Sequence, residues 1–343
     1  MRAQDTWMFA EAAEAGAVVA RQLRDNRELV ARAADRLRRS PPSAVQICGR
    51  GSSDNAGVYA RYLIEAETGV LTSPAPLAVS SLYRQTPHLP GGVCLAISQS
   101  GRSPDLVAAA SAARAGGAFV IALVNAEGSP LGDVTDLTLP LRAGEERSVA
   151  ATKSFIASLT AVAQLVADWR EDEALKAALE ALPEQLEDAW RLDWSPAVDA
   201  LKGASSLYVV GRGPGYGIAR EAALKLKETC RLHAEGFSAA EVRHGPMALV
   251  RQDFPVLFLT QRDAALADNE QLAREFAERG ARVIAAPAIE AGGVLSLPAI
   301  RGHATLEPIL LIQSFYRLAA EVAVARGLNP DQPPYLRKVT ETV

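Results

Sequence analysis

One pattern of strand, glycine-rich turn and helix occurs twice in this 343-residue chain. It begins in "AVQICGRGSSDNAGVYARYLIEAETG" at Ala44 and again in "SLYVVGRGPGYGIAREAALKLKETC" at Ser206. In each copy an apolar run of strand length meets a Gly-Arg-Gly turn, and apolar residues at helical spacing follow. Alternating strands and helices predict parallel sheets joined by right-handed crossovers. The sequence therefore favours an α/β protein with two tandem doubly wound, flavodoxin-like domains.

Shorter apolar runs continue the pattern in both halves. The first half continues with "CLAIS" and "FVIALVN", and the second with "PVLFL" and "RVIAAP". Runs of this kind are typical of parallel strands that are buried on both faces. We expect a helical segment over 1–40, which Pro41 and Pro42 end. A first domain over 41–190, a second over 191–328 and a tail over 329–343 complete the expected organisation.

Composition excludes several classes of protein. The chain is 49% hydrophobic and 22% charged with a net charge of −4, which gives no reason to expect nucleic acid or a membrane as partner. We found no apolar run of the ~20 residues that a membrane helix needs. Asp5, Glu11 and Glu14 interrupt the apolar start, which argues against a signal peptide. No cluster has metal-ligand spacing. The expectation is a soluble cytoplasmic protein without metal or cofactor.

The polar stretch "SQSGRS" follows directly on the apolar strand "CLAI". A helix beginning after this turn offers unpaired backbone N–H groups and the positive end of its dipole. Ser98, Gln99, Ser100 and Ser103 add side-chain donors, and Gly101 allows close approach of the backbone. These features predict a cradle for a phosphate ester.

The alternative interpretation of this turn is a helix start that serine merely caps. The second half has "LTQRDA" at the corresponding place, without the run of serines. Serines that served only as caps would be needed in both copies, so we expect a ligand in the first half alone. In "GRGSSDN", Ser52 and Ser53 are placed to bond sugar hydroxyls, and neither turn has the pattern of a nucleotide site.

The helix "EAALKLKETC" places Glu221, Lys225 and Glu228 within reach of one face, by their spacing of four and three residues. The commoner fate of such a face is a run of solvated ion pairs. The segment "HAEGFSAAEVRHGP" follows and is expected to be irregular, with the composition of a binding loop. His233 and Glu241 are expected to be structural residues of that loop.

Several motifs taken together resemble the SIS (sugar isomerase) family. They are "GRGSSDNAG", "SQSGRS", "SVAATKSF", "EAALKLKETCRLHAEGFSAAEVRHGP" and "DQPPYLRK". Within that family, the chain is most similar to the isomerase half of glucosamine-6-phosphate synthase, and the likeness covers nearly all of it. The resemblance implies an aldose–ketose phosphosugar site and a homodimer with shared active sites.

The resemblance also implies roles for individual residues. The phosphate ligands would be Ser98, Gln99, Ser100 and Ser103. The sugar would be held by Ser52, Ser53 and the backbone near Val149 and Ala150. We also expect Arg337 to contact the substrate, although it stands where the synthase has a small residue. The remaining implied roles are catalytic. Glu228 would move a proton between C1 and C2, and Lys338 would form a Schiff base with the ketose or polarise its carbonyl. His244 of a neighbouring subunit would help to open the ring, and Lys225 would support Glu228.

The chain departs from the synthase at its start, where Arg2 stands in place of a nucleophilic cysteine and strand-forming sequence begins about forty residues in. We therefore expect no ammonia-producing domain. The leading hypothesis is isomerising deamination of an amino-sugar 6-phosphate, in which glucosamine 6-phosphate and water give fructose 6-phosphate and ammonia. Isomerisation of this kind needs a positioned carboxylate and a carbonyl activator.

Two other hypotheses stay open. A deglycase would release an amine from a fructosamine 6-phosphate with the same carboxylate and phosphate cradle. A non-catalytic phosphosugar sensor is a third possibility, although the first 40 residues carry no recognition helix. The sequence leaves undetermined the exact sugar and its epimer, any allosteric effector and the physiological direction of the reaction.

Overall fold

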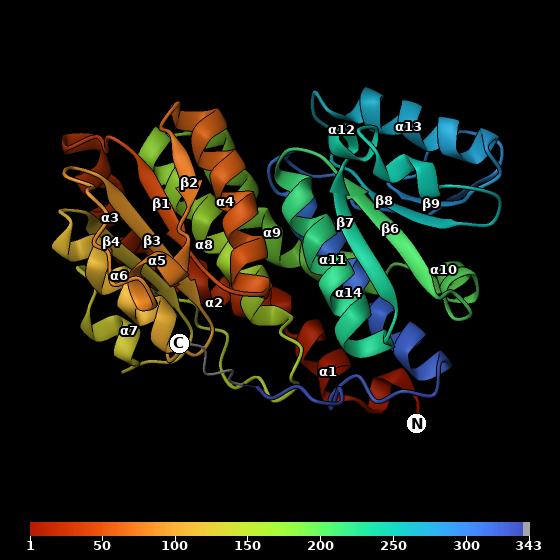
Figure 1. Ribbon diagram of the computed structural model, residues 1–343, viewed down its shortest axis with the longest axis horizontal. Helices are drawn as coiled ribbons and strands as arrows, with labels where there is room; N and C mark the ends of the chain where they lie inside the picture. The colour runs from red at the N-terminus through yellow and green to blue at the C-terminus, as the bar shows by residue number, and fades with distance from the viewer. Residues whose placement is uncertain (339–343) are drawn as a thin grey trace. The chain divides into compact units, whose positions relative to one another are not determined.

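The computed structural model describes residues 1–338, which form two compact units (Figure 1). We call residues 17–146, 154–181 and 337–338 the serine unit, because it contains the serine-rich turn after residue 97. Residues 1–16, 147–153 and 182–336 form the glutamate unit, which contains Glu228.

The serine unit is built on a five-stranded sheet in the order β2-β1-β3-β4-β5. All of its neighbouring strands are parallel. The strands are β1 (Val45–Cys48), β2 (Thr72–Pro74), β3 (Val93–Ser98), β4 (Phe119–Val124) and β5 (Leu137–Pro140). The helices are α2 (Ala15–Asp25), α3 (Arg27–Arg39), α4 (Ser52–Thr68), α5 (Leu77–Ser81), α6 (Pro104–Ala115), α7 (Pro130–Asp133) and α8 (Lys153–Arg170).

Helices α4 and α6 cover opposite faces of this sheet. A Cβ on Gly57 of α4 would stand 2.8 Å from the Ile47 side chain, whereas the next residue, Cys48, packs in one core cluster with Leu106 and Ala109 of α6. Alternate residues of a strand point to opposite faces, so this arrangement follows from the strand period. The strand order reverses between β1 and β3, because β2 is added on one side of β1 whereas β4 and β5 follow on the far side of β3, and this makes a topological switch point.

The glutamate unit has a second five-stranded sheet, in the order β10-β9-β8-β6-β7. Its strands are β6 (Ser206–Gly211), β7 (His233–Ser238), β8 (Pro255–Leu259), β9 (Arg282–Ala286) and β10 (Val294–Ser296). Its helical elements are η1 (Ala3–Asp5), α1 (Trp7–Ala13), α10 (Ser195–Leu201), α11 (Pro214–Cys230), α12 (Ala239–Val242), η2 (Pro246–Leu249), α13 (Leu266–Glu278) and α14 (Glu307–Ala325). Helix α9 (Glu173–Arg191) contributes residues to both units.

The two sheets have the same strand order when each is numbered along its own half: second, first, third, fourth, fifth. That order is the flavodoxin-like form of the doubly wound fold. The predicted α/β class and the use of one architecture twice are confirmed. The boundaries predicted for the four segments remain predictions.

Two expectations about local structure were wrong. The segment after α11 is not irregular, because His233–Ser238 forms β7 and pairs with β6 as an edge strand. An edge strand has a neighbour on one side only, so it tolerates a polar sequence that does not look like a buried parallel strand.

Among residues 1–338, α14 also meets the length and hydropathy of a membrane span, with mean hydropathy 1.3. Since 78% of that window is buried in the protein, α14 has the character of a core helix.

Candidate active site

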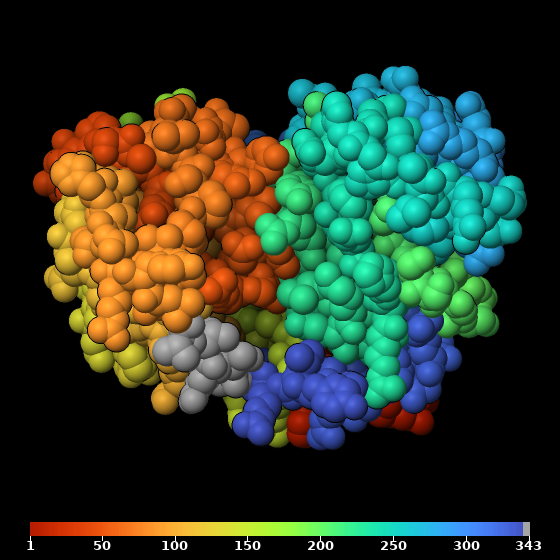
Figure 2. Space-filling view, in the orientation of Figure 1, coloured from red at the N-terminus to blue at the C-terminus, as the bar shows by residue number. Residues whose placement is uncertain are grey.

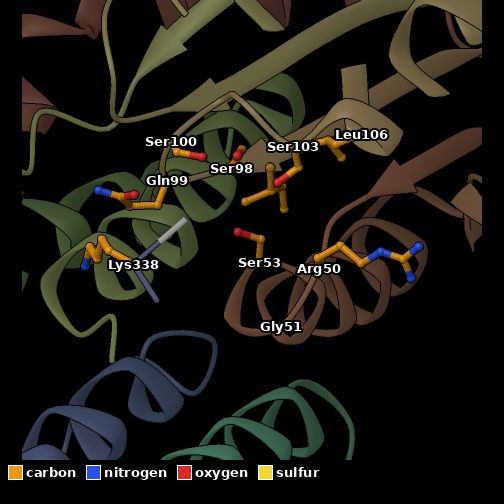
Figure 3. Close-up of a pocket in the computed structure, with 10 residues that line it drawn as sticks. Arg50, Gly51, Ser53, Ser98, Gln99, Ser100, Ser103, Leu106 and Lys338 are labelled. Atoms are coloured by element: carbon orange, nitrogen blue, oxygen red, sulfur yellow. The ribbon is translucent and has the colours of Figure 1, made fainter. Parts of the chain in front are cut away.

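A pocket of about 360 Å³ lies in the serine unit at the carboxyl ends of β1 and β3 (Figure 3). Its lining consists of Arg50, Gly51, Ser53, Ile97, Ser98, Gln99, Ser100, Ser103, Leu106 and Lys338. Ligands of doubly wound folds bind at the switch point beyond the carboxyl ends of the strands, which is the place of this pocket. Six of the residues predicted to bind or act on a substrate therefore line one cavity.

The turn after β3 is held in shape by its own side chains. The backbone N–H of Gly101 donates to Ser98 Oγ at 2.9 Å, and the N–H of Arg102 donates to Ser100 Oγ at 3.3 Å. Gly101 has a φ of +62°, and a Cβ there would stand 2.3 Å from Ser129 Oγ. Only glycine fits both the backbone angle and the space. The hydroxyls of Ser98 and Ser100 each accept a hydrogen bond here, so each keeps its proton free to donate to a ligand.

The alternative of a simple serine-capped helix is not what the structure shows at α6. Ser103 occupies the N-cap position, but its side chain makes no capping hydrogen bond, and Pro104 takes the first helical position. The pocket also receives the start of α4, where Ser53 faces the serines of the β3 turn (Figure 3). Ser52 is the first residue of α4, and it is not among the described residues that line this pocket.

Arg50 lines the pocket, but its guanidinium is directed away from the serines (Figure 3). It forms a two-pronged pair with Asp105 Oδ2, at 2.9 Å from Nε and 2.8 Å from Nη2. The Asp105 side chain is 1% exposed, so this pair joins the starts of α4 and α6. Our reading of the sequence missed Arg50 and Leu106 as lining residues, although Arg50 stands between the two glycines of the turn.

Lys338, from the end of the described chain, lines the same pocket. Its Nζ donates to Glu146 Oε2 at 3.2 Å, and the Glu146 side chain is fully buried. The hydroxyl of Ser154 donates to the same carboxylate at 2.7 Å and its backbone N–H at 3.2 Å. The neighbouring Arg337 is exposed. In Figure 2 the stretch that precedes these residues (blue) lies on the surface, where Tyr335 and Leu336 are exposed.

The glutamate unit contains a buried charged cluster on α11. Lys225 Nζ lies 2.5 Å from Glu228 Oε2 and 3.4 Å from Glu221 Oε1, with Glu221 and Lys225 almost completely buried and the Glu228 side chain 21% exposed. The Tyr316 hydroxyl donates to Glu221 Oε1 at 3.3 Å. Burial alone would lower the pKa of Lys225, but the two carboxylates outweigh it and hold that pKa above its usual value. The reading of this face as solvated ion pairs is therefore wrong.

The remaining predicted residues also belong to the glutamate unit. Ala150 is buried, and the backbone N–H of Val149 donates to the Asp331 carbonyl at 3.3 Å. His244 is exposed just after α12, where its backbone N–H donates to the Glu241 carbonyl at 2.9 Å. The buried carboxylate of Glu11 accepts from the backbone N–H of Ser148 at 3.1 Å, which supports the same loop.

The corresponding edge of the second sheet is occupied by protein side chains. Gln261 follows β8, and its amide donates to the Arg212 carbonyl at 2.9 Å. Arg262 pairs with buried Glu307 at 2.7 Å. These contacts agree with the expectation that only the first copy keeps an open phosphate cradle. Residues 1–338 contain no group of three or more His, Cys, Asp or Glu placed to hold a metal ion.

Comparison with known proteins gives the family. The model of the SIS domain matches residues 40–167 and again 200–286, so the chain belongs to the SIS domain family. A solved structure from Silicibacter pomeroyi, described as a candidate phosphosugar isomerase, is 42% identical with a TM-score of 0.91. The match covers 95% of this chain and all of that one. The C-terminal domain of glucosamine-fructose-6-phosphate aminotransferase from Francisella tularensis is 25% identical with a TM-score of 0.83, over 95% and 98% of the two chains.

A curated relative is the isomerizing glutamine–fructose-6-phosphate aminotransferase of Aeropyrum pernix, which is 37% identical over 313 residues. The match covers 85% of this chain and 50% of the relative. The chain thus spans about half the length of the curated relatives it matches. The predicted family and its link to the aminotransferase are confirmed.

Proposed function

We propose that this protein is a phosphosugar isomerase that deaminates an amino-sugar 6-phosphate. In the proposed reaction glucosamine 6-phosphate and water give fructose 6-phosphate and ammonia. The observation that carries this proposal is a single pocket in which serine hydroxyls and Lys338 converge. The serine hydroxyls suit a phosphate ester, and the Lys338 amine suits a sugar carbonyl.

The phosphate is proposed to bind the turn after β3. Ser98 and Ser100 have hydroxyl protons to donate, and α6 begins immediately after Ser103, so its dipole favours an anion there. The guanidinium of Arg50, which also lines the pocket, is already engaged by Asp105. Neutral donors and a helix start therefore provide the phosphate site, and Gln99 adds an amide at its edge.

Lys338 is proposed to add its amine to the C2 carbonyl of the open-chain ketose, with loss of water, to form a Schiff base. Glu228 is proposed to move the proton between C1 and C2, since its carboxylate is partly exposed and bonded to the Lys225 ammonium. Val149, Ala150, Ser52, Ser53 and Arg337 are proposed sugar contacts.

Ammonia release from glucosamine 6-phosphate by the purified protein tests the reaction. Glu228→Gln is expected to lower the rate about 10²- to 10⁴-fold, the usual contribution of a general base. Lys338→Ala is expected to abolish trapping of the sugar by borohydride. Glu278→Gln, an exposed carboxylate at the end of α13 in the same unit, is the matched control and is expected to keep full activity.

A protein that binds the sugar phosphate without releasing ammonia would contradict the deaminase and favour a deglycase or a sensor. Fructosamine 6-phosphate adducts distinguish these two, because only a deglycase would turn them over. Unchanged turnover in Glu228→Gln would refute the assignment of the base.

A homodimer is part of the proposal, with His244 supplied by the neighbouring subunit. The exposure of His244 agrees with that role. Sedimentation as a fully active monomer would refute it. The cytoplasmic location stays a prediction.

A further inference from the structure

Glu146 is a buried carboxylate to which no role was assigned from the sequence. It lies in the loop between β5 and α8, and its side chain has no exposed surface. A buried carboxylate is costly unless hydrogen bonds and a cation compensate for the loss of water. Ser154 provides two of these bonds, and Lys338 Nζ provides the cation at 3.2 Å.

Ser154 holds the Glu146 carboxylate by bonds that do not involve the lysine. Ser154 is in the first turn of α8, so both of its bonds come from a rigid helix start whose dipole favours an anion. Lys338, by contrast, follows the exposed residues Tyr335, Leu336 and Arg337. The ammonium group of Lys338 therefore meets a carboxylate that the start of α8 already holds by two hydrogen bonds.

We propose that Glu146 is the positioning residue of Lys338: it holds the ammonium group in the wall of the pocket and accepts one of its protons when the neutral amine adds to the sugar carbonyl. This inference rests on the proposed function, because it gives the partner of the proposed Schiff-base lysine. An ion pair with a buried, hydrogen-bonded carboxylate fixes geometry far better than an exposed one, in which both side chains keep their freedom.

The inference predicts different effects on binding and on chemistry. Glu146→Gln keeps the size of the side chain but removes the charge that attracts Lys338. The hydrogen bonds given above join Glu146 to Ser154 and Lys338, not to the serine-rich turn after β3. We therefore expect KM for the sugar phosphate to change little. We expect kcat to fall about 100-fold, the loss that displacement of a reacting group by about 1 Å can cause.

The test measures two properties of Lys338 in the full-length protein. Mass spectrometry follows how fast acetic anhydride modifies this lysine without substrate, and how much fructose 6-phosphate borohydride traps on it. In Glu146→Gln we expect faster modification and less trapping. Glu146→Asp keeps the charge and is expected to recover part of both, which a purely structural loss would not give.

Glu127→Gln is the matched control, because it removes a surface ion pair with Arg142 in which the Glu127 side chain is 75% exposed. It is expected to change neither property. Ser154→Ala keeps the carboxylate but loses the 2.7 Å bond, and is expected to give a smaller effect of the same sign. This second variant also keeps the test available if Glu146→Gln does not fold.

The outcomes test two separate claims, the contact of Glu146 with Lys338 and the Schiff base on Lys338. If Glu146→Gln and Ser154→Ala both leave modification of Lys338 at the wild-type rate, Glu146 does not hold the lysine and the inference is overturned. If the wild-type protein turns over the sugar but traps none on Lys338, the Schiff base in the proposed function fails. The modification rate then still decides the contact with Glu146.

Discussion

Replacement of Lys225 by methionine tests the buried charges of α11 most directly. In the wild-type protein its ammonium lies 3.4 Å from Glu221 and 2.5 Å from Glu228. At an effective dielectric constant of about 20, two unit charges 3.4 Å apart attract by about 5 kcal/mol. Lys225→Met removes this attraction and leaves Glu221, which is fully buried, without its cation.

Breaking a buried ion pair from one side costs about 3–5 kcal/mol. The bond from the Tyr316 hydroxyl to Glu221 remains, so we expect a loss near the lower end, about 3 kcal/mol. The entropy of unfolding for a chain of 343 residues is about 0.7 kcal/mol/K, so a single cooperative transition would shift by about 4 °C. Calorimetry and urea denaturation measure this change.

The pH dependence gives the result a second signature. Because the pKa of Lys225 is raised in the folded state, its stabilising effect is complete below its unfolded value of about 10.5 and is lost as pH rises through the folded value. Between about pH 6 and 9 the difference in the free energy of unfolding between wild type and variant should therefore be constant.

Lys227→Met is the matched control, since Lys227 is exposed on the same helix. We expect it to change stability by less than about 0.5 kcal/mol. If both substitutions lower the free energy of unfolding by the same amount, the assignment of a strong buried charge cluster is refuted. Replacing Glu221 by glutamine in the Lys225→Met variant should recover part of the loss.

Two further predictions concern the cradle and a buried thiol. Gly101→Ala should raise KM for the sugar phosphate strongly, because its Cβ would meet Ser129. Gly128→Ala is the control, because Gly128 has a similar φ of +64° but open space around it, and its KM should not rise. Equal KM values for the two variants would contradict this prediction. Burial raises the pKa of Cys230 to about 11. The folded state then keeps this proton while the unfolded chain loses it, so stability should fall as pH rises from about 9 to 11, and Cys230→Ala should reduce that slope. An unchanged slope would refute it.

Much of the site was predictable because it lies in contiguous motifs. "SQSGRS" after an apolar strand indicated both the turn and its hydroxyls, and Ser98, Gln99, Ser100 and Ser103 line the pocket as expected. Arg50 was missed because its side chain is committed to Asp105, a partner 55 residues away in the sequence. The β7 strand was missed because an edge strand of this sheet carries little of the apolar signal on which strand prediction depends.

Local sequence patterns were enough to predict the repeated α/β architecture and the place of the serine-rich turn that lines the pocket. Strand period, helix spacing and glycine turns are local properties, and each is encoded in a few consecutive residues. The burial of Lys225 beside two carboxylates could not be predicted in this way, and neither could the contact of Lys338 with Glu146, which lies 192 residues earlier. Burial and charge pairing depend on which distant segments the fold brings together, and no local pattern records that choice.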